Sequence, residues 1–303
     1  MTGVNHEWEW VPCPLCAGRD SKLLFLDRLT WKDRELIFRL VECLNCGLWF
    51  VNPRNLTDAG KFYRDDVSWE QLERWVEEQG VHKQRLADKL LCFAARFLEE
   101  RKLTERRLLD IGCGVGYFLD YARRRGYETY GVEISRPEAE YARQRFKVEV
   151  FCGQLERSPF PDGSFQVVTM LDVLEHLSNP LEVLRTVCSK LQPGGLLILR
   201  SANGRFALLK ARLFSRLIPG AEYLLHPNEH LIQPTSRILT MFLNKAGFRV
   251  LRIDNGWPEY VPYTFRRAVR IAWGILSRGI CAVSHVYFSN SLDVFAVRNE
   301  GEQ

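Results

Sequence analysis

Three glycines alternate between residues 112 and 116, within the stretch LDIGCGVGYF that begins at Leu109. Such a loop lets the backbone turn sharply and lets a ligand come close, because glycine lacks Cβ. The spacing differs from the G-x-G-x-x-G of a dinucleotide site, and no Lys-Ser/Thr comes after it as in a Walker phosphate loop. Asp110 precedes the glycines, and Glu133 closes the next apolar run 23 residues further on. A carboxylate there can accept both hydroxyls of a ribose, so the pattern predicts a ribose pocket without a pyrophosphate site.

Four of the nine cysteines form two C-x-x-C pairs near the N-terminus, and 27 positions separate the pairs. Four thiolates from two such turns complete the tetrahedral shell of a structural Zn²⁺. A pair of disulfides is disfavoured without a signal peptide, and a redox C-x-x-C would explain only one pair. A closed site of this kind leaves no position for chemistry and serves as scaffold. The predicted zinc ligands are Cys13, Cys16, Cys43 and Cys46.

The composition is that of a folded chain with one large and one small domain, with 303 residues, 46% hydrophobic and 12% aromatic. A formal net charge of +5 does not by itself indicate nucleic-acid binding. The first twelve residues lack the basic start and apolar core of a secretory signal. The uncharged stretch 279–292 is shorter than the roughly 20 residues that a spanning helix needs. We therefore expect a cytoplasmic protein.

Periodic runs of apolar residues indicate the helices and strands that position these residues. Apolar side chains recur at helical spacing between Trp69 and about Leu103, for example at Leu86 and Leu90, and we expect this helix to pack on the next domain of the chain. From Arg107 onward, seven short apolar runs alternate with helical stretches, which is typical of a mostly parallel α/β sheet. The expected domains are a zinc ribbon over residues 1–55, a helical connector over 56–105, and an α/β domain over 106–303 with an insertion at about 204–230 and an amphipathic helix at about 262–280.

Five motifs stand in order between residues 107 and 298: LLDIGCGVGYFL, GVEIS, PFPDGSFQVVTMLDVLEHL, LQPGGLLIL and NKAGFRVL. In this order they resemble the class I S-adenosylmethionine-dependent methyltransferases. The resemblance implies a Rossmann-like, seven-stranded, mostly parallel sheet and S-adenosylmethionine as the methyl donor. The alternative for each glycine is an ordinary strand-to-helix turn, and for Glu133 a surface acid.

The resemblance also implies a cofactor pocket, in which the glycine loop lies along the methionine part and Glu133 holds the ribose. The sequence departs from the family pattern at two positions. Gln154 occupies a position near the adenine that is often acidic in the family. Gln166 occupies a position that is often Asp, and we interpret this position as structural. Gln can still accept a hydrogen bond through its carbonyl. The predicted cofactor-binding residues are Asp110, Gly112, Cys113, Gly114, Gly116, Tyr117, Glu133, Ile134, Gln154, Leu155, Leu171 and Asp172.

The segment CPLC…CLNCGLWFVNPR…KFY in front of such a domain resembles the zinc-ribbon methyltransferases of sugar and natural-product tailoring. The longer sugar C-methyltransferases among them carry a further C-terminal domain that 303 residues do not accommodate. The resemblance implies methyl transfer to an O, N or C nucleophile of a small-molecule acceptor: a sugar, a glycolipid or a natural-product intermediate.

The acceptor side is predicted at the segment LDVLEHL, because open α/β sheets bind ligands beyond the carboxyl ends of their strands. His176 is the predicted catalytic base, oriented by Asp172 or Glu175, and His230 is the second predicted catalytic residue. Alternatively, Glu175 and His176 cap the following helix or hold the cofactor-side loop. A divalent cation held by Asp172, Glu175 and His176 is a further alternative.

Two basic segments remain. The insertion carries Lys210, Arg212 and Arg216 and is predicted to lie over the substrate end of the sheet as a lid, with a solvated basic helix as the alternative. The amphipathic helix at about 262–280 places several arginines on one face. Such a face could contact anionic lipid headgroups or a lipid-linked acceptor, although such helices also pack on their own domain.

Two other classes of function stand as alternatives. An RNA methyltransferase could grip nucleic acid with the ribbon, but the ribbon mixes acidic and basic side chains and gives no basic footprint, so nucleic acid is not an expected partner. A non-catalytic protein that binds the cofactor would show no turnover. The sequence leaves the oligomeric state open.

Overall fold

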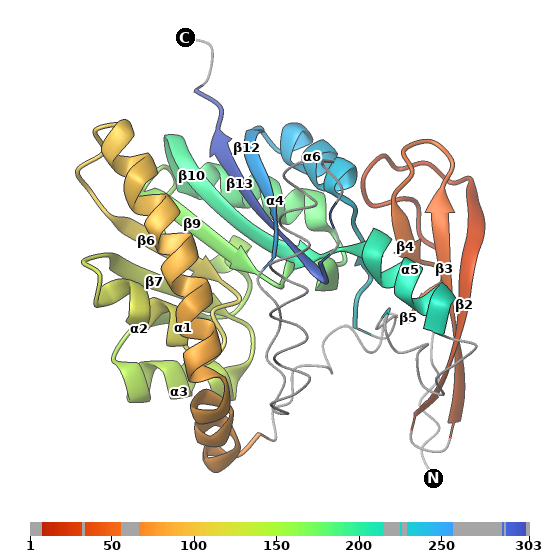
Figure 1. The fold of residues 1–303 in the computed structure, drawn as a ribbon, viewed down its shortest axis with the longest axis horizontal. Coiled ribbons are helices and arrows are strands. Elements are labelled where there is room, and N and C mark those ends of the chain that lie inside the picture. The colour runs from red at the N-terminus through yellow and green to blue at the C-terminus, as the bar shows by residue number, and fades with distance from the viewer. Residues whose placement is uncertain are drawn as a thin grey trace.

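The computed structural model describes residues 8–31, 34–55, 67–214, 225, 229–256, 287 and 289–300 (Figure 1). The arginine-rich helix predicted at about 262–280, the second half of the basic insertion and Arg216 lie outside these residues. No helix of the described part of the chain is both long and apolar enough to cross a membrane.

A seven-stranded sheet forms the centre of the molecule, in the order β12-β13-β10-β9-β6-β7-β8. Strand β13 runs antiparallel to both of its neighbours, and the other pairs are parallel. Each of the seven predicted apolar runs supplies one strand, so the predicted α/β fold with a mostly parallel sheet is confirmed. The strands are β6 (Arg107–Ile111), β7 (Glu128–Glu133), β8 (Glu149–Cys152), β9 (Phe165–Leu171), β10 (Leu191–Ala202), β12 (Phe248–Asn255) and β13 (Ser291–Arg298).

Neighbouring residues of the central strands enter opposite cores, because side chains alternate across a strand. Leu108 packs with the helices α1 (Trp69–Glu100), α2 (Tyr117–Arg123) and α3 (Arg136–Phe146). Leu109 packs with α4 (Pro180–Lys190) and α6 (Ser236–Lys245) on the other face. Both faces of the sheet are therefore covered, as the continuous apolar runs require.

Helix α1 lies along one face of the sheet (Figure 1). It begins at a capping box, in which Ser68 and Gln71 exchange side-chain and backbone hydrogen bonds. Leu86 and Leu90 are buried in the core, and Lys89 forms an ion pair of 2.6 Å with Asp293 of β13. The helix thus packs on the sheet, as its periodicity predicts.

The N-terminal ribbon is built on a second sheet of four strands in the order β11-β4-β3-β2. Strand β11 comes from a segment that lies after the insertion, about 180 positions after its neighbour β4. Leu48 and Phe50 of the ribbon share one core with Phe242 of α6, so the ribbon and the central sheet form a continuous apolar interior. The strands are β2 (Ser21–Trp31), β3 (Arg34–Cys43), β4 (Trp49–Val51) and β11 (Ile232–Gln233), and β1 (Trp8–Glu9) pairs separately with β5 (Arg54–Asn55).

Helix α5 (Gly204–Phe214), the first half of the insertion, starts at the end of β10 and runs beside the ribbon (Figure 1). Its buried residues Ala207, Leu208 and Ala211 pack with Leu40 of β3. The first half of the insertion, predicted as a lid over the sheet, therefore rests on the ribbon through these three residues, while Leu209 and Leu213 of the same helix are exposed.

Candidate functional site

The glycine loop joins β6 to α2 and takes left-handed backbone angles at each of its three glycines. Gly112 has φ +69°, and a Cβ there would collide with the side chain of Val173. Gly116 has φ +79°, and a Cβ there would lie 2.7 Å from the Cβ of Ala142 in α3. Both positions therefore require glycine for conformation and for space.

Asp110 and Glu133 lie at the ends of β6 and β7 beside this loop, and both are buried. Thr169 Oγ1 donates a hydrogen bond of 2.6 Å to Asp110. Glu133 accepts the backbone N–H groups of Gly114 and Ser135, each at 2.8 Å. Burial raises the pKa of Asp110 to about 7, and burial also raises the pKa of Glu133.

Two charged side chains near the loop were not among the residues predicted from the sequence. Glu138 of α3 lies next to Gly114, at 3.4 Å from where a Cβ would stand, and burial raises its pKa to about 7. The charge of Lys83 in α1 lowers the pKa of Asp110, so this amine lies near the same pocket. Neither residue stands in a motif, and only three-dimensional proximity identifies them.

Asp172 comes directly after β9 and has φ +58°, a conformation that Asp tolerates better than most side chains. Arg200 of β10 donates to Asp172 at 3.2 Å and to Asp293 at 3.3 Å. Lys89 of α1 also binds Asp293. The side chains of Lys89, Asp293, Arg200 and Asp172 therefore form a chain of alternating charges from α1 to the end of β9. This network, with Arg200 at its centre, fixes the carboxyl edge of the sheet.

The other predicted pocket residues differ in their exposure. Tyr117 starts α2 and donates its hydroxyl hydrogen to the carbonyl of Gly80 in α1, at 2.9 Å. Ile134 is exposed, which is unusual for a large apolar side chain beside a buried acid. Gln154 is exposed, whereas Leu155 and Cys113 are buried and Leu171 is half-buried. The cofactor contacts of all these residues stay predictions.

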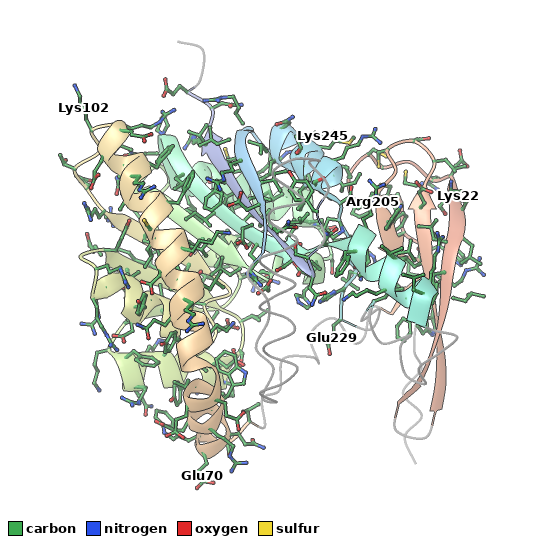
Figure 2. The ribbon with its side chains drawn as sticks, viewed as in Figure 1. Lys22, Glu70, Lys102, Arg205, Glu229 and Lys245 are labelled. Atoms are coloured by element: carbon green, nitrogen blue, oxygen red, sulfur yellow. The ribbon has the colours of Figure 1, made fainter. Side chains whose placement is uncertain are left out.

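His176 and His230 lie side by side although 230 − 176 = 54 positions separate them in the chain. Their ring centroids are 4.9 Å apart, with the planes nearly perpendicular. His176 ends the short 3₁₀ helix η2 (Leu174–His176), and its Nδ1 lies 3.0 Å from the carbonyl oxygen of Glu229. Since a carbonyl only accepts, Nδ1 carries the proton and Nε2 of the neutral ring keeps its lone pair. Figure 2 shows Glu229 between the central sheet and the ribbon.

The orientation of His176 by Glu175 or Asp172 stays a prediction, and both carboxylates are bonded to other residues as well. The buried carboxylate of Glu175 accepts from Ser201 Oγ at 2.9 Å and from the backbone N–H of Ala202 at 3.0 Å. Asp172 accepts from Arg200. Ligand atoms of Glu175, His176 and His230 do lie within 4.8 Å of one another, so the group that could hold a cation includes His230 in place of Asp172.

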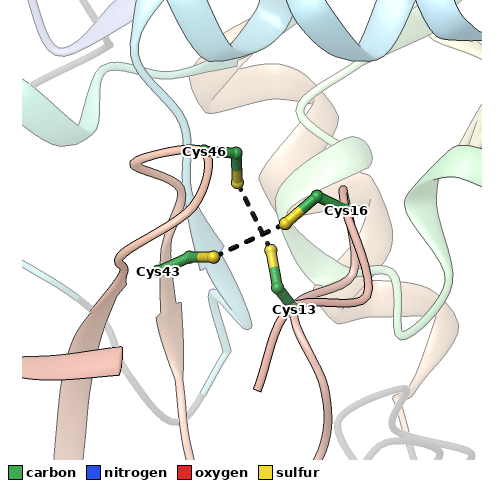
Figure 3. Close-up of side chains that lie close together, drawn as sticks. All are labelled: Cys13, Cys16, Cys43 and Cys46. Atoms are coloured by element: carbon green, nitrogen blue, oxygen red, sulfur yellow. Dashed lines mark hydrogen bonds between the residues drawn. The ribbon is translucent and has the colours of Figure 1, made fainter. Parts of the chain in front are cut away.

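The four cysteines of the two C-x-x-C pairs converge at one point (Figure 3). The sulfur atoms of Cys13 and Cys46 are 3.5 Å apart, as are those of Cys16 and Cys43, and all four lie within 4.8 Å of one another. A tetrahedron with Zn–S bonds of about 2.3 Å has sulfur atoms about 3.8 Å apart. Burial raises the pKa of Cys46 to about 11, as expected for thiols gathered without a cation. The arrangement fits a tetrahedral metal ion.

These features, a seven-stranded sheet with one reversed strand, a glycine loop after β6 and an acid at the end of β7, define the class I S-adenosylmethionine-dependent methyltransferases. A family model described as a methyltransferase domain matches residues 72–253, which is more than half of the chain. The chain belongs to this methyltransferase family.

Among curated relatives, the ubiquinone biosynthesis O-methyltransferase of Alkalilimnicola ehrlichii is 35% identical over 129 residues, which cover 41% of this chain and 50% of the relative. The enzyme of the same name from Marinobacter nauticus is 32% identical over 170 residues, covering 51% of this chain and 68% of the relative. The chain thus spans about one half to two thirds of the length of these relatives.

Among solved structures, the plantazolicin methyltransferase BpumL in complex with SAH aligns with a TM-score of 0.53 and 16% identity, over 80% of this chain and 94% of that one. Magnesium protoporphyrin IX methyltransferase from Synechocystis PCC 6803, with bound SAH, gives a TM-score of 0.52 and 19% identity, over 80% and 100% of the two chains. At these identities the likeness establishes the fold.

Proposed function

We propose that this chain transfers the methyl group of S-adenosylmethionine to a nucleophile of a small-molecule acceptor. The observation that carries the proposal is the paired imidazoles of His176 and His230 at the carboxyl edge of the sheet. Val173 packs on Gly112 of the glycine loop, and His176 comes three residues after Val173. A proton acceptor thus stands next to the predicted cofactor pocket.

The residues of that pocket fit the cofactor. A Cβ at Gly114 would meet Glu138 at 3.4 Å, an ordinary contact distance, so the loop backbone can be approached closely there. The carboxyl groups of Asp110, Glu133 and Glu138 have pKa values raised by burial, and a cationic ligand would stabilise their ionised forms. When bound, S-adenosylmethionine supplies an electrophilic methyl group on a sulfonium. Asp110 and Glu133 would hold its methionine and ribose parts, with Lys83 and Tyr117 at the α1 side.

His176 would act as general base through Nε2, because the carbonyl of Glu229 holds its other nitrogen in the protonated form. His230, in contact with that ring, would bind the acceptor or stabilise the imidazolium that forms. Holding the nucleophile in line with the methyl group supplies the rest of the rate enhancement.

A hydroxyl-bearing acceptor suits this arrangement, because a hydroxyl must lose its proton as the new bond forms. The named activity of the O-methyltransferase relatives supports oxygen as the nucleophile. A sugar, a glycolipid or a natural-product intermediate remains the proposed acceptor class. Leu209 and Leu213 are exposed beside Arg212 on α5, which supports an acceptor with a lipid part.

We also propose that the four cysteines hold one structural Zn²⁺. Their sulfur spacing and their burial support the assignment. Replacing Cys13 by Ser should reduce the zinc content of freshly prepared, reduced protein from one ion per chain to a small fraction. Wild-type protein without zinc in the same elemental analysis would reject the site.

The experiment for the methyl transfer uses methyl-labelled S-adenosylmethionine and fractionated small-molecule extract. Wild type should label a fraction that His176→Ala does not, while both proteins bind SAH equally in calorimetry. Gly112→Val, which fills the loop, is the control that loses SAH binding. Label in no fraction together with intact SAH binding would reject the catalytic proposal and leave a protein that only binds the cofactor.

A further inference from the structure

Strand β2 is the outer strand of the ribbon sheet. Among the described residues it pairs with β3 along one side, and no strand pairs with its other side. Figure 1 shows β2 at the end of the molecule opposite α1. An edge strand leaves a row of outward N–H and C=O groups, which is a template for pairing with another chain. At 11 residues, β2 is long enough for such pairing.

Two leucines of β2 are exposed, Leu23 at 45% and Leu26 at 50%. In a regular strand, positions three apart point to opposite faces, because side chains alternate. The register of β2 against β3 shifts by one residue after Leu23, however, so that Leu23 pairs with Val41 and Leu26 with Arg39. Since positions 39 and 41 share a face of β3, the shift brings both leucines to one face of the ribbon.

The sequence of β2 is complementary to itself in the antiparallel direction. If position 23 of one copy lies opposite position 26 of a second copy, the exposed leucines are neighbours across the junction. The same register places Lys22 opposite Asp27, once on each side of a two-fold axis. A shift of one position would instead place Lys22 opposite Arg28. Apolar pairs and opposite charges stabilise adjacent strands, whereas like charges destabilise them.

The geometry of β2 meets the condition that this pairing sets. Residues opposed across a two-fold axis normal to a sheet must lie on the same face. Positions 22 and 27 pair with 42 and 38 of β3, which are an even number of residues apart and so share a face. Lys22 binds Glu42 of its own chain at 2.8 Å, yet its side chain is 59% exposed. Its ammonium has three donors and can bind a second carboxylate.

We propose that two copies of this chain associate through β2, edge to edge about a two-fold axis, so that their ribbon sheets become one continuous sheet. The contact covers Leu23 and Leu26 of both copies and forms the pair of Lys22 with Asp27 twice. Lysine on an edge strand commonly prevents pairing, but here the second copy offers it a carboxylate. The glycine loop lies in the central sheet, away from this edge, so the dimer is independent of methyl transfer (Figure 1).

The test measures the mass of the 303-residue protein by sedimentation equilibrium over a series of concentrations. Wild type should approach twice the chain mass of 35.3 kDa as the concentration rises. Asp27→Lys and Lys22→Glu each create two like-charge pairs, and each should raise the dimer dissociation constant about tenfold or more. An equimolar mixture of the two variants should dimerise as wild type does, because every lysine then faces an acid.

Leu23→Ser should also raise the dimer dissociation constant about tenfold or more, because it removes apolar area from both halves of the contact. The matched control is Ile134→Ser, which removes an aliphatic side chain of similar exposure, 44%, far from the ribbon and should leave that constant unchanged. Circular dichroism checks the fold of each variant. A wild type that stays monomeric throughout would overturn the inference, and so would a dimer that neither charge variant weakens.

If the variants do not fold, the wild type carries the test. A carbodiimide joins an amine to a carboxylate in contact with it, and is added to isotope-labelled and unlabelled protein mixed in equal amounts. Peptide mass spectra should show Lys22 joined to Asp27 in pairs of mixed isotope composition, which arise only between two copies. Cross-links of Lys22 confined to pairs of one isotope composition, such as that with Glu42 of its own chain, would overturn the inference.

Discussion

Replacing Asp110 by Asn should stabilise the cofactor-free protein increasingly as the pH rises, and should weaken cofactor binding. Burial raises the pKa of Asp110 from 3.8 to about 7. Between these values the folded chain keeps a proton that the unfolded chain releases, so the free energy of unfolding of the wild type falls as the pH rises. Asn keeps an oxygen that accepts from Thr169 and has no charge to bury.

The size of the effect depends on the pH interval crossed. Of the interval from pH 5 to pH 8, about two pH units lie below the folded pKa of about 7. Each of these units changes the free energy of unfolding by about 1.4 kcal/mol. The stability advantage of Asp110→Asn should therefore grow by about 3 kcal/mol over this range. The assay is urea unfolding of both proteins at a series of pH values without cofactor.

The control is Asp162→Asn, because Lys190 lowers the pKa of the exposed Asp162 and its loss should bring no gain at higher pH. Parallel stability profiles for wild type and Asp110→Asn would refute the reasoning, since they would mean that Asp110 is ionised at little cost. SAH calorimetry at pH 8 checks the predicted loss of cofactor binding. Equal SAH affinity of wild type and Asp110→Asn would remove Asp110 from the pocket.

Three further outcomes are expected. Gly112→Val should abolish SAH binding measured by calorimetry, because the loop must shift where the new side chain meets Val173; retained affinity in a variant that is folded by circular dichroism would contradict the pocket. His176→Ala should lower turnover of the labelled acceptor by about 10²–10⁴-fold with SAH affinity intact, and full activity would leave positioning as the only catalytic device. Arg200→Met should lower the free energy of unfolding by about 3–5 kcal/mol in urea titrations, because it leaves the fully buried Asp293 with one cation fewer; a loss below about 1 kcal/mol would contradict the network.

The central sheet was predictable because each strand is a short apolar run bounded by helical stretches, and both of its faces are buried. The cysteine cluster was predictable for a different reason. A C-x-x-C turn presents two sulfur atoms at one vertex whatever surrounds it, so two such turns identify a shared centre from spacing alone. Gln166 also took the structural place expected of it: its side chain accepts from the backbone of Arg107 and donates to Glu105 and Gln192.

Other parts of the site depend on packing that no local pattern encodes. Lys83 and Glu138 stand on helices whose charged residues look like ordinary solvent-facing positions, and they matter only because α1 and α3 flank the glycine loop. The contact of His176 Nδ1 with the carbonyl of Glu229 was not predicted, because any residue type can supply a carbonyl. Arg200 lies within an apolar strand, where one basic residue gives no sign of the two acids it joins.

The meeting of His176 with His230 illustrates the same limit most clearly. Ile232 and Gln233 form a strand of two residues, too short for alternation to reveal, and that strand exists because β4 offers an edge with which it can pair. The position of His230 is therefore decided by a pairing partner that lies about 180 positions earlier in the chain. The same sheet contains β3, which ends at the proposed zinc ligand Cys43, so loss of the proposed metal should first disturb the acceptor side. The glycine loop lies between β6 and α2 and contacts the acceptor-side segment through Val173, which packs on Gly112.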